Sequence, residues 1–335
     1  MLVLAAVAVA LALQPANPTW TSDGTRVAYA NLGSSSARGE LVVAYADGSG
    51  RHVVYKSDTC CEPVLGAAGS RIVFVSNFQL YAVGAGGGKV TPLALSPGFN
   101  TPWFTLSPNR ETIAFDDGCA CGHSPDSVAL VGVRAGGRPF VVARPKKTTD
   151  SIDGFSPDGT LLVFTRAPWD YNGASKGKPV LMAQSVRGGR AVPLARSGLI
   201  GASSVPSNAL WPQWSPDGKW VAFIVPRPTP RLELLSTSGG APSVLVPKLS
   251  GLSSFSWSPT STRIAFGQYG HQTDALATVD LQGHETVVSG SLVWVSNDSW
   301  DRPQWSPDGS RLTFMVRGGG IWVVGADGTG LKQIA

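Results

Sequence analysis

One ten-residue pattern recurs along the chain and constrains its fold more than any other feature. At Trp214 the sequence WSPDGKWVAF combines an aromatic residue, a Ser-Pro-Asp-Gly corner and an alternating apolar run, and nearly the same letters return at Phe155 and Trp305. Pro presets φ in a tight turn, Asp bonds to nearby backbone and Gly accepts positive φ, so the corner predicts a hairpin. Seven copies begin at the anchors Trp20, Leu65, Leu106, Phe155, Trp214, Trp257 and Trp305.

The spacing of the anchors indicates a circular repeat architecture. Successive anchors are 41 to 59 residues apart, which is typical of propeller blades. Each interval also contains two further strand-like runs, such as LVVAYADGSGRHVVY at 41–55. The strand after the Trp214 corner is apolar on both faces, so neighbours must cover both. We therefore predict an all-β fold: a single seven-bladed β-propeller of four-stranded antiparallel blades over residues 18–335.

Two features of the repeats bear on the ring. The first anchor lies near the start of the chain and the last is followed by enough residues for a complete blade, which predicts that the first blade packs on the last without a strand exchanged between the termini. Repeats two and three carry GAAG (66–69) and SPNR (107–110) in place of the full corner. Their hairpins therefore depart most from the repeated pattern.

The repeat resembles that of the TolB family, whose WD-repeat-like propeller shares WSPDG followed by an alternating IAF-type strand. The resemblance covers residues 18–335, and seven copies in phase make it specific. It implies a TolB-like propeller, but only the propeller part, because TolB carries an additional amino-terminal α/β domain for which this chain has no room. It also favours a non-enzymatic binding or scaffold protein.

The amino-terminal residues suggest export. Residues 2–13 form an apolar run, followed by Gln14 and Pro15, and small residues within the run could serve a signal peptidase. The run is short for a bilayer span. We expect 1–17 to be a signal peptide or amino-terminal apolar segment, with a buried strand as the alternative. An extracytoplasmic location (periplasmic, secreted or cell-surface) follows, with no integral membrane span after processing.

The four cysteines support the same location. Cys60 and Cys61 precede the second inner strand, while Cys119 and Cys121 follow the third. Propeller topology brings both pairs to one rim, where disulfides suit an exported protein. The alternative is a four-thiolate zinc site near His123, but CC with CxC is not the usual zinc spacing. We expect disulfides and no metal.

Other catalytic and binding signatures are missing from the sequence. There is no Gly-x-Ser-x-Gly elbow. The carboxylates Asp158, Asp217 and Asp308 belong to the repeated corners, so we expect them to stabilise turns and not to act in catalysis. The net charge of +5 is spread among the repeats, whereas nucleic-acid binding needs a clustered basic stripe. We expect no cofactor, no nucleic acid and a monomer, with a protein or envelope polymer as the partner.

Long insertions mark one face for recognition. The segments 167–178, 196–211 and 296–302 emerge on the same side as the cysteines, and they combine aromatic with polar residues as recognition surfaces do. The predicted binding residues are Trp169, Asp170, Tyr171, Asn172, Trp211, Trp300, Asp301 and Arg302. The alternative for Trp211 and Trp300 is that they cover the ends of inner strands as packing residues.

Two classes of function remain open. The first is an exported, non-enzymatic binding or scaffold protein that uses this loop-rich face. The second is a hydrolase or lyase acting on a polysaccharide or peptide through carboxylates such as Asp116, Asp117, Asp170 and Asp301. A carboxylate pair with a perturbed pKa near the central axis would favour the enzyme.

Overall fold

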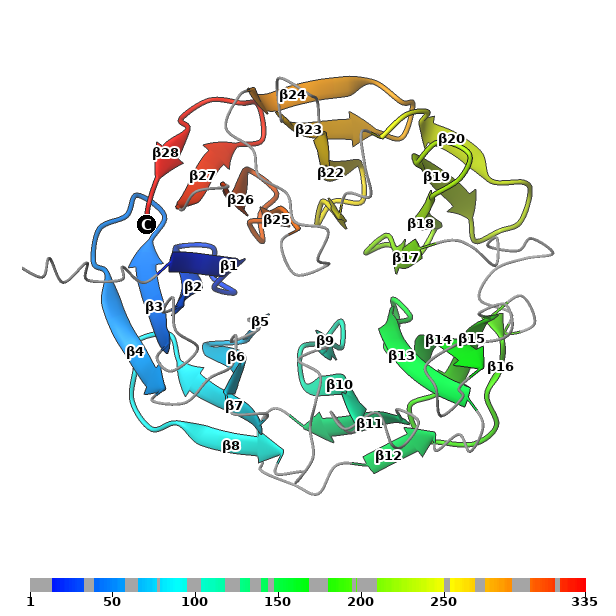
Figure 1. Ribbon diagram of the computed structural model, residues 1–335, viewed down its shortest axis with the longest axis horizontal. Coiled ribbons are helices and arrows are strands. Elements are labelled where there is room, and N and C mark those ends of the chain that lie inside the picture. Colours follow the sequence, from blue (N-terminus) through cyan, green and yellow to red (C-terminus); the bar gives the residue numbers. More distant parts are fainter. Residues whose placement is uncertain are drawn as a thin grey trace, which may run out of the picture.

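The computed structural model shows an all-β ring of seven four-stranded antiparallel sheets (Figure 1), as predicted. It describes residues 14–32, 39–57, 66–76, 79–94, 104–117, 127–132, 140–143, 148–168, 180–194, 197, 210–249, 254–268, 275–290, 302–316 and 320–335. No helix within these ranges is long and apolar enough to cross a membrane.

Each blade consists of four consecutive strands, and their order along the chain is their order from the ring axis to the periphery. Blades 1 and 2 contain β1 (Gln14–Trp20), β2 (Arg26–Leu32), β3 (Gly39–Tyr45), β4 (His52–Ser57), β5 (Gly66–Ala68), β6 (Arg71–Ser76), β7 (Gln79–Gly84) and β8 (Thr91–Ala94). Blades 3 and 4 contain β9 (Phe104–Leu106), β10 (Thr112–Asp117), β11 (Ser127–Gly132), β12 (Phe140–Ala143), β13 (Thr148–Phe155), β14 (Leu161–Pro168), β15 (Val180–Ser185) and β16 (Val192–Pro193). Blades 5 to 7 contain β17 (Leu210–Trp214), β18 (Trp220–Val225), β19 (Arg231–Ser236), β20 (Ser243–Val246), β21 (Phe255–Trp257), β22 (Arg263–Gln268), β23 (Ala275–Asp280), β24 (Glu285–Gly290), β25 (Gln304–Trp305), β26 (Arg311–Met315), β27 (Ile321–Gly325) and β28 (Lys332–Gln333).

The ring closes without an exchanged strand, as predicted. β1 pairs within the first blade, and the last blade consists of β25 to β28. Residues 14–17, which the sequence-based division placed in the amino-terminal segment, belong to β1. Blades 7 and 1 are joined by side chains instead, through an apolar cluster that includes Trp20, Tyr29 and Ile321.

Apolar packing between blades explains why the strands are hydrophobic on both faces. Seven clusters of described residues each join two neighbouring blades. On β18, Ala222 and Ile224 pack toward blade 6, whereas Val221, Phe223 and Val225 pack toward blade 4. Burying one such large side chain stabilises a fold by about 1.5–3 kcal/mol, so every blade depends on both neighbours.

The Ser-Pro-Asp-Gly corner is held by its own hydrogen bonds. Ser215 Oγ donates to Asp217 Oδ1 at 2.6 Å, and the same carboxylate oxygen accepts from the main chain of Lys219 at 3.2 Å. The Gly218 main chain donates to Ser215 O at 2.9 Å, with Gly218 at a φ of 74°. The Asp therefore closes the turn, as the sequence pattern predicts.

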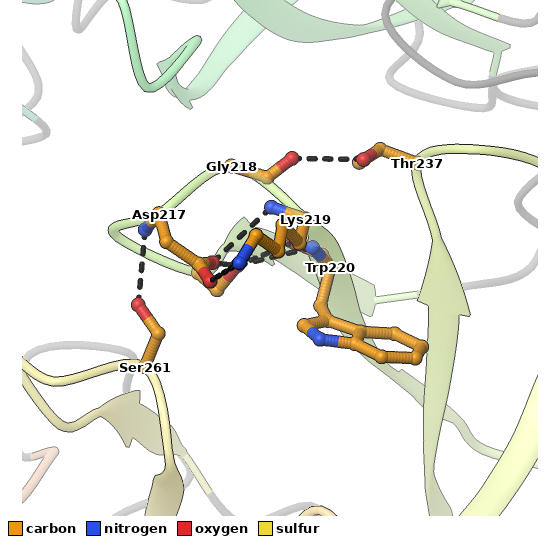
Figure 2. Close-up of polar contacts among 7 residues, drawn as sticks. Asp217, Gly218, Lys219, Trp220, Thr237 and Ser261 are labelled. Carbon is orange, nitrogen blue, oxygen red and sulfur yellow. Dashed lines mark hydrogen bonds and ion pairs between the residues drawn. The ribbon is translucent and has the colours of Figure 1, made fainter.

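Corners of neighbouring blades also interlock. A Cβ added to Gly218 would lie 3.2 Å from Pro157 of the preceding blade, and one on Gly24 would lie 3.3 Å from Pro307. Blade 6 has Ser261 at the glycine position, with a φ of 61°, and its Oγ accepts a hydrogen bond of 2.9 Å from the Asp217 main chain (Figure 2). Glycine or a short hydroxyl therefore fits at these junctions between corners.

The two irregular repeats behave differently. In blade 3 the five-residue corner persists, with Asn109 accepting from Ser107 Oγ at 2.6 Å and Arg110 at a φ of 57°. In blade 2, Ala68 pairs with Arg71, which leaves a two-residue turn. Ala67 consequently takes the strand position that Trp214 has in blade 5, two residues after the expected anchor.

Candidate functional site

The molecule has two unlike faces around the ring axis. The corners lie on one face, which we call the corner face. The antiparallel meander places the starts of the innermost strands, the ends of the second strands and the starts of the third strands on the other, which we call the loop face. The predicted recognition segments leave the blades on the loop face.

Only two of the predicted binding residues, Trp211 and Arg302, lie among the described residues. The others lie outside them: Trp169, Asp170, Tyr171, Asn172, Trp300 and Asp301. The same holds for the predicted disulfide residues Cys60, Cys61, Cys119 and Cys121. Their assignments therefore stay predictions.

Trp211 combines strand packing with an unusual backbone. It lies at an irregularity of β17 between Leu210 and Gln213, with a φ of 53°. Its half-buried ring packs against the apolar cluster between blades 5 and 6. The packing alternative therefore accounts for part of Trp211, while a bulky residue at positive φ is a strained conformation of the kind that concentrates at functional sites.

Arg302 lies two residues before β25, at the loop-face end of the innermost strand of blade 7. The side chain is half-buried, and loss of water lowers the pKa of its guanidinium. An arginine nevertheless stays charged, so a cation is held close to the start of an inner strand.

A belt of hydrogen bonds fixes the inner strands of these blades to one another. Trp257 Nε1 donates to Gln213 O at 3.1 Å, Trp305 Nε1 donates to Ser256 O at 3.2 Å, and Trp20 Nε1 donates to the last blade. Three of the four anchor tryptophans thus bind the main chain of the preceding blade. The sequence analysis missed this belt, although NPTW and RPQW end at two of the three donors, Trp20 and Trp305.

Four residues precede the belt at the same spacing in the sequence. Three residues before their anchors stand Asn17, Trp211, Ser254 and Arg302, on blades 1, 5, 6 and 7. Ser254 is 5% exposed, and its Oγ has no hydrogen-bond partner within the described part of the chain. Asn17 and Trp211 lie within β1 and β17 at positive φ, whereas Ser254 and Arg302 precede β21 and β25, so the four share a sequence position but not a backbone conformation.

The inner hairpin of blade 4 is long and strongly anchored. β13 and β14 pair from Phe155 as far as Thr148 opposite Pro168, directly before the predicted binding residues. Asp150 is fully buried and accepts from Arg166 Nε at 2.7 Å and from Nη2 at 2.6 Å. Asp150 raises the pKa of Arg166, so the pair is ionic and rigid.

Asp153 is the titratable group that stands out near the axis. It is the additional residue at an irregularity of β13 between Ile152 and Gly154, and it accepts from Thr165 Oγ1 at 2.8 Å. Burial raises the pKa of this carboxyl to about 7. Asp153 therefore exchanges its proton near neutral pH, whereas the nearby Asp150 is engaged by Arg166.

The corner carboxylates have the opposite character. Hydrogen bonds from Ser306 and Ser310 lower the pKa of Asp308 to about 2. The Ser156 hydroxyl and the Thr160 main chain lower the pKa of Asp158 in the same way. These groups are ionised acceptors inside turns, in agreement with a structural role. Across the residues described, no group of three or more His, Cys, Asp or Glu side chains could hold a metal ion.

No protein-family model and no curated protein sequence matches this chain. Several solved propeller structures are similar to this chain. A putative TolB from Agrobacterium tumefaciens has a TM-score of 0.55 and 18% identity, over 77% of this chain and 90% of that chain. An oligogalacturonate lyase from Vibrio parahaemolyticus has a TM-score of 0.65 and 10% identity, over 94% and 90%.

A puromycin-hydrolyzing peptidase from Mycobacterium tuberculosis has a TM-score of 0.66 and 14% identity, over 97% of this chain and 53% of that chain. At these identities the likeness shows the propeller fold alone. That fold is shared by TolB-like proteins and by propellers of lyases and peptidases.

Proposed function

We propose that this chain is an extracytoplasmic, non-enzymatic binding protein that recognises a protein partner or an envelope polymer through its loop face. The observation that carries the proposal is the β13–β14 hairpin. Its end is fixed by the buried Asp150–Arg166 pair, and the chain continues from Pro168 directly into the segment with Trp169 and Tyr171. A rigid base that presents aromatic and polar loop residues is how recognition sites are built on scaffolds.

The likeness to TolB propellers supports this class of function. The corner carboxylates Asp217 and Asp308 also agree with it, because their hydrogen bonds stabilise the turns. The export signal and the disulfides predicted from the sequence agree with an extracytoplasmic partner.

A matched pair of crosslinking variants tests the choice of face. Thr229 is exposed between β18 and β19 on the loop face, and Thr260 is exposed in a corner of blade 6. A photoreactive amino acid placed at Thr229 should crosslink a specific component of the cell envelope, and the same probe at Thr260 should not. Equal crosslinking from both faces, or crosslinking from Thr260 alone, would contradict the proposal.

A second candidate function rests on Asp153. A carboxyl with a pKa of about 7 close to the axis suits general acid or base chemistry, and propellers of a lyase and a peptidase share the fold. Asp150 and Asp153 do not make the carboxylate pair that would favour an enzyme, because Asp150 is bound to Arg166. Cleavage of envelope polysaccharide or peptide that Asp153→Asn abolishes would favour this alternative over the binding protein.

A further inference from the structure

Three aromatic rings meet where blades 1 and 2 join. β4 of blade 1 lies beside β7 of blade 2 (Figure 1), and the end of β4 and the start of β7 lie on the loop face. The rings of Tyr55 and Tyr81 stack with their centres 6.2 Å apart, and these centres lie 4.7 and 5.7 Å from that of Phe74. Phe74 is fully buried, whereas both tyrosines are half-buried. The junction therefore presents two partly exposed tyrosines that pack on a buried phenylalanine.

The same two positions hold small aliphatic residues where blades 5 and 6 join. Tyr55 pairs with the last residue before a ladder irregularity of the third strand, and Val246 of blade 5 does the same. Tyr81 is the first residue after such an irregularity, as Ala277 of blade 6 is. Val246 and Ala277 are 1% and 0% exposed in the apolar cluster between their blades. Two small side chains are therefore enough to close such a junction, and the phenol rings exceed that need.

Hydrogen-bonding groups accompany the two rings. Tyr55 Oη donates to Ser76 Oγ at 3.2 Å, and Tyr81 Oη donates to Gln79 Oε1 at 2.7 Å. Each phenol oxygen keeps lone pairs that can accept a hydrogen bond. The amide nitrogen of the half-buried Gln79 donates to no group within the described ranges. Unused N–H donors and unused acceptors thus lie together beside aromatic surface.

The charges next to these groups cancel. Lys56 follows Tyr55 on β4 and pairs with Glu40 at 3.2 Å. Burial, and then the neighbouring Tyr55, raise the pKa of Tyr81, so its hydroxyl stays protonated at neutral pH. The surroundings therefore suit an uncharged ligand better than an acid or a base.

A sugar ring has the matching chemistry. Its C–H groups form an apolar face that packs on aromatic rings, and its hydroxyls both donate and accept hydrogen bonds. A proline-rich peptide also packs on aromatic rings, but its prolines have no N–H groups to donate to the phenol oxygens. The mixture of donors and acceptors favours the sugar.

We propose that Tyr55, Tyr81 and Gln79 bind a neutral sugar residue of an envelope polysaccharide, with the exposed parts of the phenol rings packing on the sugar ring and the Gln79 amide donating to a hydroxyl. This inference rests on the proposed function for the choice of the loop face. It adds a site on blades 1 and 2, and it selects a polysaccharide over a protein as the partner.

Saturation-transfer NMR with the full chain tests the proposal, because it detects weak binding of small molecules. The probes are neutral trisaccharides of glucose, galactose, mannose and N-acetylglucosamine, with trigalacturonate as an acid and hexaproline as a peptide for comparison. At least one neutral trisaccharide should bind, and more tightly than either comparison probe. Binding of no neutral trisaccharide, or tighter binding of trigalacturonate or hexaproline, would overturn the proposal.

An exchange that copies another junction of the same ring separates the site from blade packing. Tyr55→Val with Tyr81→Ala introduces the pair of residues that closes the junction between blades 5 and 6, and should weaken binding of the trisaccharide about tenfold or more. Tyr45→Ala is the matched control, because Tyr45 is 42% exposed at the corner-face end of β3 in the same blade. It should leave binding unchanged.

Gln79→Ala provides the decisive comparison if the double variant folds poorly. The Gln79 side chain bonds only to the half-buried Tyr81 among the described residues, so the melting temperature should change little. Binding should weaken about fivefold, the loss expected for one hydrogen bond between neutral groups. If Gln79→Ala and Tyr45→Ala bind the trisaccharide equally well, the sugar site is wrongly assigned. The crosslinks from Thr229 would still test the proposed function independently.

Discussion

The indole of Trp20 donates a hydrogen bond of 3.0 Å to the carbonyl of Gln304, 284 residues away. Arg311 strengthens the same junction, because its Nη2 donates to Gly24 O at 2.7 Å and its guanidinium carbon lies 4.8 Å from the centre of the Trp20 ring. Blades 1 and 7 are therefore joined by the repeated anchor itself.

Replacing Trp20 tests this closure. Trp20→Phe keeps most of the apolar surface but leaves Gln304 O without its donor, and should cost about 1–3 kcal/mol in the free energy of unfolding. Trp20→Ala should cost about 3–5 kcal/mol. Urea unfolding measures both. Equal losses in the two variants would mean that the indole N–H contributes nothing to the junction.

Two glycines separate backbone strain from contact between corners. Gly218 and Gly69 both have positive φ, but an added Cβ at Gly218 meets Pro157 at 3.2 Å and one at Gly69 meets nothing within 4 Å. Gly218→Ala should therefore lower the melting temperature more than Gly69→Ala. A larger loss for Gly69→Ala would contradict the interlocking of adjacent corners.

Removing one partner of the Asp150–Arg166 pair should destabilise the blade 4 hairpin more than replacing both partners. Asp150→Ala leaves the partly buried Arg166 charge without its carboxylate and should cost about 3–5 kcal/mol, whereas the double change Asp150→Leu with Arg166→Met should cost less. Chemical unfolding of the two variants provides the comparison. A double variant that is less stable than Asp150→Ala would show that the ion pair has net value beyond its buried charge.

The pH dependence of stability should carry opposite contributions from two aspartates. The folded pKa of Asp153, about 7, lies above its ordinary value of 3.8, so the stability it contributes is fully present below about pH 4 and is lost as the pH rises through 7. Asp153→Asn should remove this loss, which makes the variant gain stability relative to the wild type between about pH 5 and 8. Urea unfolding across that interval checks the sign, and a relative loss would contradict the raised pKa.

Asp308 provides the control for that series. Its folded pKa of about 2 lies below 3.8, so its contribution is present above about pH 4 and is lost as the pH falls toward 2. Asp308→Asn should leave the slope between about pH 5 and 8 as in the wild type.

The sequence predicts the fold well because the corner is local chemistry. Ser215, Asp217 and Gly218 form a turn among themselves, so their letters reveal a hairpin wherever they recur, and the spacing reveals the ring. The turn of blade 2 was not predicted from its local sequence GAAG. Its two-residue length follows from the pairing of Ala67 with Ile72 on the next strand.

The candidate site was less predictable for the same physical reason. The partner of Asp153 lies on the neighbouring strand, and the partner of the Gln213 side chain lies on the next blade. Ser254 Oγ has no partner among the described residues. All three environments depend on long-range packing. Loop composition singled out Trp211, but only the structure shows its packing between blades and its positive φ.

Binding of the envelope component identified by crosslinking, measured for loop and anchor variants side by side, tests the recognition proposal most directly. Trp169→Ala with Tyr171→Ala should weaken binding at least tenfold while the melting temperature stays close to that of the wild type, because loop residues contribute little to the core. Trp305→Ala should instead destabilise the protein by about 3–5 kcal/mol, since Trp305 is 8% exposed between blades. If the loop variant binds as the wild type does, or melts as early as Trp305→Ala, then the loop-face recognition residues are wrongly assigned.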